Sequence, residues 1–289
     1  MFDLVKATTK DGLILNGLFS QGEKKNPTVI HIHGFEGDFF NNKFINVIAK
    51  KLKKHGTNFL TVQTRGMGND YDLTTENGQY RRYGAHFELL NEAYLDIDSW
   101  IDFLQKHGYN QTILQGHSLG TVKVIRYLFE GSYRKEVKKL ILLSPFDNFW
   151  FFGKYATKGK LGKYLKKAKE KIKKKKGEEI VTKDFPGMQD LSYQSYLSWL
   201  ENERLSRMFA FFDKNYSFPI LKKIQIPVKV IVGTSDEYFH PTNPKDPKEA
   251  FNILKSNVKN FSGKLIENAN HGFAGYEDVV ADEVLNFVL

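Results

Sequence analysis

One serine stands between two glycines where an apolar run gives way to a helical pattern. Residues 112–120 read TILQGHSLG, so Ser118 lies in a Gly-x-Ser-x-Gly motif that follows a predicted strand and precedes the helical pattern TVKVIRYLF. A tight strand-to-helix turn of this kind holds the serine in a strained conformation, and side chains at Gly116 or Gly120 would collide with neighbouring backbone. The hydroxyl is then presented at the positive end of the helix. The pattern predicts that Ser118 is a nucleophile.

A serine hydroxyl needs a general base, and the base needs an acid that orients it. Asp236 closes the strand-like run VKVIVGTSD, and His271 follows KLIENAN, so we expect both at the carboxyl edge of a sheet. The interval between them leaves room for one helix and one strand, as a crossover connection requires. We therefore expect Ser118, His271 and Asp236 to act as nucleophile, general base and orienting acid.

Two other acids remain open as alternatives. Asp147 stands just past another predicted strand in SPFDN, and Glu237 directly follows Asp236. Among the other histidines, His117 flanks the serine but should point elsewhere because of the turn geometry, and His240 lies on the same loop as Asp236. We therefore expect neither histidine to be the base.

An acyl-transfer site also needs backbone N–H groups directed at the developing oxyanion. In this arrangement one comes from the residue after the nucleophile, here Leu119, and one from the loop after an earlier strand. The run VIHIHGFEGDF supplies such a strand and loop. We expect the N–H of Phe35 to be the second donor, with that of Glu36 as the alternative.

Short runs rich in Val, Ile and Leu alternate with helical patterns, which is typical of a mostly parallel sheet flanked by helices. The predicted strands cover 4–8, 13–19, 28–33, 58–63, 112–116, 139–143, 228–233 and 264–267. The predicted helices cover 42–55, 87–107, 119–129, 247–256 and 275–288. His55 and His107, each followed by glycine, are expected at helix ends. The chemistry-bearing residues all follow predicted strands.

The alternation breaks in one long segment after the sixth predicted strand. Residues 146–222 contain an amphipathic basic helix around 161–172 and a second helical pattern over 191–207. An insertion at the carboxyl end of a central strand should lie above the site. We predict a core domain formed by 1–145 and 223–289, with 146–222 as a helical lid.

Composition narrows the class of protein. The 289 residues are 41% hydrophobic and 26% charged, which is typical of a globular chain, and there is no cysteine to form disulfides or a thiolate site. No secretory leader and no membrane-spanning run is visible, so we expect a cytoplasmic protein. No phosphate-binding loop or metal-ligand spacing indicates a cofactor or metal.

The positive charge is concentrated in one place. The net charge is +10, and residues 154–183 hold thirteen lysines and three glutamates, so the rest of the chain is neutral. A local excess of this kind does not predict nucleic-acid binding. The alternative to an enzyme is a binding protein that uses the basic lid to bind anionic lipid or a polyanion. We favour a solvated helix face over membrane contact. The oligomeric state is not predicted.

The motifs together resemble the α/β-hydrolase superfamily. They are HGF at 33–35, Arg65-Gly66 after a strand, GHSLG at 116–120, TSDEY at 234–238 and NHGF at 270–273. The first and last resemble cinnamoyl and feruloyl esterases, which carry a lid after the same strand. The stretch from GHSLGTVKV through the lid is similar to a poorly characterised group that includes fungal siderophore esterases. After Arg65-Gly66 the chain has MGND in place of the commoner Gly-x-Ser ending.

The resemblance implies an eight-stranded α/β-hydrolase fold with a helical lid after the sixth strand. A serine with this triad supports cleavage of carboxylic esters through an acyl-enzyme, with a small-molecule ester as substrate. Thioesterase or acyltransferase activity on the same triad is the alternative.

Overall fold

A single twisted sheet organises the molecule. The computed structural model describes residues 2–155, 158–181, 190–201, 203–239 and 246–289. The strands of the sheet are β1 (Asp3–Thr8), β2 (Ile14–Ser20), β3 (Thr28–Ile32), β4 (Asn58–Val62), β7 (Thr112–His117), β8 (Val137–Leu143), β9 (Val228–Gly233) and β10 (Phe261–Ile266). They form an eight-stranded sheet in the order β1-β2-β4-β3-β7-β8-β9-β10. β2 is antiparallel to both neighbours and the strands from β4 to β10 are parallel, which confirms the predicted fold class.

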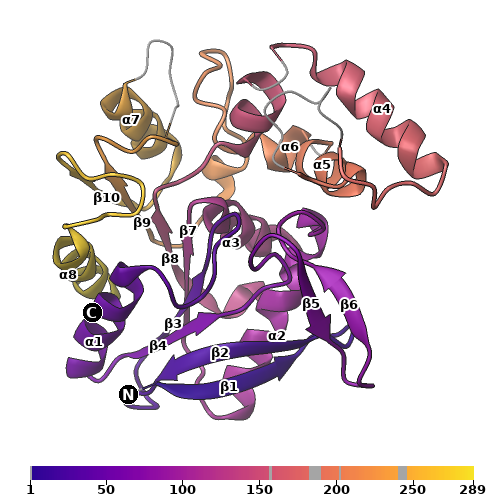
Figure 1. Ribbon diagram of the computed structural model, residues 1–289. Coiled ribbons are helices and arrows are strands. Elements are labelled where there is room, and N and C mark those ends of the chain that lie inside the picture. Colours follow the sequence, from indigo (N-terminus) through magenta and orange to yellow (C-terminus); the bar gives the residue numbers. More distant parts are fainter. Residues whose placement is uncertain (1, 156–157, 182–189, 202, 240–245) are drawn as a thin grey trace.

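The central strands are covered on both faces. Every residue of β3, β4 and β7 is buried, which is why these strands have continuous apolar runs rather than alternation. On one face Val29 and Ile113 join the cluster of α1 (Lys43–Lys54) and α8 (Glu277–Val288). On the other face Ile30 and Leu114 pack with α2 (Ala93–Lys106) and α3 (Leu119–Glu130). The helices therefore lie in two layers around the sheet (Figure 1).

Most helix bounds agree with the prediction. α1 ends at Lys54 with His55 as its C-cap, and the next residue is Gly56, whose φ of 71° is the left-handed conformation that glycine adopts at helix ends. α2 begins later than predicted, after the 3-10 turn η1 (Leu90–Glu92), because two groups that a helix would pair with each other bond elsewhere: the carbonyl of His86 accepts from the Ser192 N–H and the N–H of Leu90 donates to Ser198 Oγ. Within the described ranges, no helix is both long and apolar enough to cross a membrane.

The segment between β8 and β9 is helical in its described part. It contains the π-helix η3 (Phe149–Tyr155), α4 (Leu161–Lys173), α5 (Tyr193–Leu200), α6 (Glu203–Ser206) and the 3-10 turn η4 (Leu221–Lys223). α4 packs against α5, and both lie beyond the edge of the sheet at the top of Figure 1. The predicted helix 161–172 is confirmed as α4. The pattern over 191–207 gives two short helices, not one. The remaining helix, α7 (Pro247–Asn257), precedes β10.

A small hairpin was not predicted. β5 (Tyr71–Thr74) pairs antiparallel with β6 (Tyr80–Tyr83). Only one residue of these eight, Leu73, is buried, so the hairpin has no apolar alternation by which sequence could reveal it.

Three buried histidines lie in or next to β3 and β7. Burial lowers the pKa of His31 well below its ordinary value and lowers the pKa of His33 and of His117 to about 3. The Nδ1 atom of His31 lies 2.8 Å from Nε2 of Gln115 on the neighbouring strand. These imidazoles are therefore neutral in the folded protein at neutral pH.

The buried histidines should make stability depend on pH. Because the unfolded chain takes up protons that the folded chain cannot, each contributes a loss of about 1.4 kcal/mol per pH unit as the pH falls from about 6.5. We expect His117→Gln, whose amide cannot be protonated, to reduce the slope of unfolding free energy against pH by this amount between about pH 6.5 and about pH 4.5. Urea unfolding of the parent and the variant measures both slopes. Equal slopes would contradict the expectation.

Candidate active site

Ser118 occupies a strained turn between β7 and α3. Its φ of 54° and ψ of −124° lie outside the regions that a serine ordinarily adopts. Its N–H donates to the carbonyl of Leu143 at the end of β8 (3.0 Å). A Cβ at Gly116 would lie 2.4 Å from the carbonyl oxygen of Gly120, and a Cβ at Gly120 would lie 2.2 Å from that of Ile32. Both glycines are therefore required by close backbone approach, as the motif predicted.

His271 and Asp236 meet at the same edge of the sheet. Nδ1 of His271 lies 2.8 Å from Oδ1 of Asp236, which is fully buried and also accepts the N–H groups of Tyr238 and Phe239. Burial favours the neutral acid, but the hydrogen bond and charge of His271, the Tyr238 amide and the Ser144 hydroxyl together hold the pKa of Asp236 below its ordinary value. The acid is ionised and fixes the orientation of the imidazole.

The alternative acids lie elsewhere. Oδ1 of the buried Asp147 accepts the N–H of Trp150 (2.8 Å), and burial raises the pKa of Asp147 to about 8, so at pH 7 this acid is mostly protonated. Glu237 bonds the backbone of His271 rather than its ring, because its Oε2 accepts the His271 N–H (3.2 Å). His240 lies outside the described residues. Of the three acids, only Asp236 bonds the imidazole.

Leu119 and Phe35, the predicted oxyanion donors, both lie in segments next to the serine. Leu119 begins α3, so its N–H has no carbonyl acceptor within the helix. Phe35 lies in a turn closed by the bond from the Gly37 N–H to the Gly34 carbonyl (3.2 Å), with Glu36 in the left-handed region at φ 52°. A Cβ at Gly34 would lie 2.8 Å from the Cβ of the serine, so this turn packs directly on the nucleophile.

A cavity of about 310 Å³ opens at this place. It is lined by Gly34, Phe35, Glu36, Gly37, Asn42, His117, Ser118, Phe146, Phe151, Phe152, Tyr238 and His271. Ser118 and His271 thus share one pocket whose walls are largely aromatic. No hydrogen bond joins these two side chains in the part of the chain described, which is common for catalytic pairs without a bound substrate.

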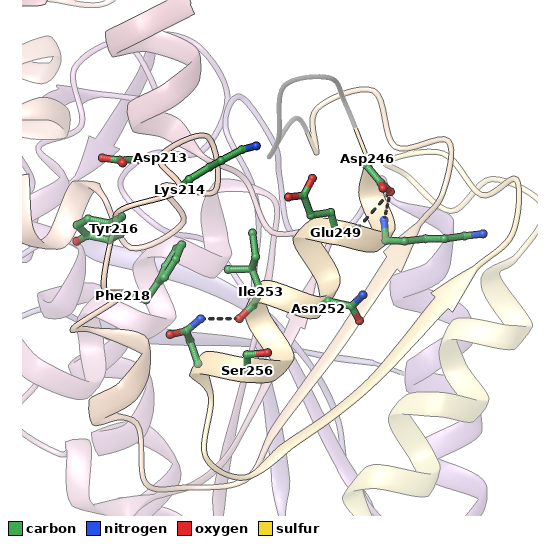
Figure 2. A pocket seen from close by; sticks show the side chains of 11 residues that line it. Asp213, Lys214, Tyr216, Phe218, Asp246, Glu249, Asn252, Ile253 and Ser256 are labelled. Carbon is green, nitrogen blue, oxygen red and sulfur yellow. Dashed lines mark hydrogen bonds between the residues drawn. The ribbon is translucent and has the colours of Figure 1, made fainter.

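A larger cavity lies away from this chemistry. It measures about 520 Å³ and lies between α7 and the segment 213–218 (Figure 2). Two of its charged side chains are already engaged: Asp213 pairs with Arg207, and Asp246 caps the N-terminus of α7. It contains neither of the residues that form the serine–histidine site. Size therefore does not identify the reacting centre.

The contacts of His117 were not predicted from the sequence. The Nε2 atom of this buried side chain lies 2.9 Å from the backbone carbonyl oxygen of His271, and the Ser144 hydroxyl donates to the same oxygen (3.1 Å). That His117 is not the base stays a prediction. No sequence pattern joins residues 117 and 271, which only the fold brings together.

A buried ion pair beneath the turn was also not predicted. Nζ of Lys123 on α3 lies 2.6 Å from Oε1 of Glu88, and both side chains are almost completely buried. A Cβ at Gly66 would lie 2.1 Å from the Glu88 carboxylate, which explains the glycine of the Arg65-Gly66 turn. Arg65 itself is buried and pairs with Asp96 (2.9 Å). Among the residues described, no group of His, Asp or Glu side chains is arranged to hold a metal ion.

Solved structures share this fold. Est1E from Butyrivibrio proteoclasticus, with ferulic acid bound, superposes with a TM-score of 0.66 at 20% identity, covering 98% of this chain and 97% of that chain. GrgF from Penicillium sp. sh18, an α/β hydrolase, gives 0.68 at 15% identity over 100% and 98%. The Pyrococcus furiosus esterase Pf2001 gives 0.58 at 17% identity over 100% and 92%. No curated protein matches the sequence.

The sequence itself matches a family of hydrolases over most of its length. Residues 23–277 match the family described as serine aminopeptidase, S33. This range includes the serine turn, the three acids considered above and His271. The chain therefore belongs to this family and is a serine hydrolase with the α/β-hydrolase fold.

Proposed function

We propose that the protein hydrolyses carboxylic esters of small molecules through an acyl-enzyme formed on Ser118. The observation that carries the proposal is the 2.8 Å hydrogen bond that Nδ1 of His271 donates to the buried, ionised Asp236, with His271 in the pocket that it shares with Ser118. A serine becomes nucleophilic at neutral pH only beside a base whose ring is held in one tautomer and orientation.

The steps follow from this geometry. Oγ of Ser118 attacks the ester carbonyl while His271 takes the proton of the hydroxyl. The imidazolium that forms is stabilised by Asp236. The N–H groups of Leu119 and Phe35 stabilise the oxyanion of the tetrahedral intermediate. His271 then protonates the departing alcohol, which leaves an acyl-enzyme. The same histidine then deprotonates a water molecule that attacks the acyl carbonyl, and it returns this proton to the oxygen of Ser118 as the carboxylic acid leaves.

The pocket favours ester substrates with an apolar or aromatic acyl group. Phe35, Phe146, Phe151 and Phe152 line it beside the serine. The similar Pyrococcus furiosus protein is an esterase, and Est1E was solved with ferulic acid bound. Both facts concern other proteins, but they are consistent with an aromatic-walled pocket that receives an ester.

We further propose that residues 146–222 form a lid on the core of 1–145 and 223–289. The insertion contributes Phe146, Phe151 and Phe152 to the pocket wall, and Trp199 of α5 packs edge-on against Phe35 (5.2 Å between ring centroids). Three hydrogen bonds support a fixed lid: Ser192 N–H to the His86 carbonyl (2.8 Å), Ser195 Oγ to the Glu88 carbonyl (2.6 Å) and Leu90 N–H to Ser198 Oγ (3.1 Å).

Ser118→Ala should abolish activity. Purified protein should cleave short p-nitrophenyl esters and be labelled by a fluorophosphonate at Ser118, and the variant should lose both by several powers of ten, because no other group can form the acyl-enzyme. Mass spectrometry of the labelled peptide identifies the site. Labelling of a different serine would refute the assignment.

The two buried aspartates should differ sharply in effect. Asp236→Asn should lower kcat by about 10⁴-fold with little change in KM, because the amide favours the wrong imidazole tautomer. Asp147→Asn is the matched control: Asp147 is mostly protonated at pH 7, so a neutral amide should change kcat little. Steady-state kinetics at pH 7 compares them. A reversed order would place the acid at residue 147.

Lid aromatics should control which esters react. Phe151→Ala should change the ratio of kcat/KM between bulky and small esters by about 10-fold, because the removed ring contacts only the larger acyl groups. The control is Lys166→Glu with Lys173→Glu, two exposed positions on α4 that should leave the ratio unchanged. A panel of esters with graded acyl length and aryl acyl groups measures it. An equal loss on every ester would show that the segment does not select substrates.

A further inference from the structure

We infer that His117 is a positioning residue that aligns His271 with the nucleophile by holding its backbone carbonyl. The inference rests on the proposed function, because alignment matters only if His271 is the base. The carrying observation is the 2.9 Å contact between Nε2 of His117 and the carbonyl oxygen of His271. This contact connects His117, which immediately precedes Ser118, to His271, which should accept the proton of Ser118.

The order of the strands explains why His271 needs this contact. Ser118 follows β7, whereas His271 follows β10, and β8 and β9 lie between these strands in the sheet. The loop that carries His271 must therefore reach back across two strands to meet the serine. A general base must approach its proton within hydrogen-bond distance, and a misplacement of about 1 Å can cost about 100-fold in rate.

Each strand under this loop contributes one group. His117 ends β7, Ser144 directly follows β8, and Asp236 lies just after β9. His117 and Ser144 both reach the carbonyl oxygen of His271, while Asp236 bonds its ring. Glu237 adds a bond to the N–H of the same residue. The backbone of His271 is thus fixed on both sides, and its ring is fixed separately.

The chemical state of His117 fits a hydrogen-bond donor. A carbonyl oxygen can only accept, so Nε2 must carry the proton. Burial lowers the pKa of His117 to about 3, so the ring is neutral and keeps one donor nitrogen. Its ring centroid lies 4.9 Å from that of His271. A neutral ring at this distance does not oppose the positive charge that His271 acquires during the reaction.

The test compares two variants at position 117, one that loses the hydrogen-bond donor and one that keeps it. His117→Phe removes the donor, and His117→Gln keeps an amide N–H at the position of Nε2. We expect His117→Phe to lower kcat by about 10- to 100-fold with KM nearly unchanged, equally on small and bulky esters, and His117→Gln to restore most of the loss. The control is His31→Phe, which removes another buried imidazole but no contact with His271, and should leave kcat unchanged.

Two results would overturn the inference. One is a His117→Phe enzyme as active as the parent, and the other is a His117→Gln enzyme as impaired as His117→Phe. The tautomer of His117, measured by long-range ¹H–¹⁵N NMR, gives an independent check that needs no activity: Nε2–H is expected, and Nδ1–H would refute the contact. A parent that neither cleaves esters nor reacts with the fluorophosphonate would count against the proposed function, while the tautomer would still decide the contact.

Discussion

The left-handed backbone of Ser118 is the constraint on which the rest of the structure depends. A non-glycine residue in such a conformation costs about 1–3 kcal/mol and persists only where the surroundings impose it. Here the cost is offset by the bond from its N–H to Leu143 and by a helix packed so closely that Gly120 touches the carbonyl of Ile32. Strands β3, β7 and β8 must therefore lie adjacent and parallel, as they do. The order of the strands and the conformation of the serine are two aspects of one arrangement.

The buried charges connect this turn to the helical insertion. Lys123 lies on the helix that follows the serine, and its partner Glu88 accepts a hydrogen bond from Ser195 of α5 through its backbone carbonyl. Breaking a buried pair by removing one partner costs about 3–5 kcal/mol because the other charge is left uncompensated. The pair thus fixes the place of the loop 86–90 against the turn. The insertion is hydrogen-bonded to this loop, so the position of the loop determines where the insertion lies.

The sequence allowed the fold to be predicted, together with the approach of Ser118, Asp236 and His271 to one another, because local patterns reveal both. Buried parallel strands have continuous apolar runs, and the serine turn needs two glycines in a fixed frame. The contacts of His117 and Glu237 with the backbone of His271 could not be predicted, since they join a side chain to a main-chain atom far away in sequence. Residues of every type carry a backbone carbonyl, so the sequence does not indicate which backbone atom a side chain will contact. The exposed β5-β6 hairpin was missed because it buries almost nothing.

The strand-end residues and the aromatic residues of the pocket come from different parts of the chain, and under the proposed function this separates reaction from selectivity. Ser118, Asp236 and His271 follow strands of one sheet, where hydrogen bonds between neighbouring strand ends fix their positions. Much of the aromatic wall comes from the start of the insertion, whose rings pack on one another, as Phe151 does on Phe152 and Phe152 on Trp199. A packed ring can be replaced by a residue of similar volume at little cost in stability. A small displacement of a hydrogen-bonded reacting group costs much more in rate. Substitutions in the insertion can therefore reshape the pocket while the strand ends keep the reacting groups in place.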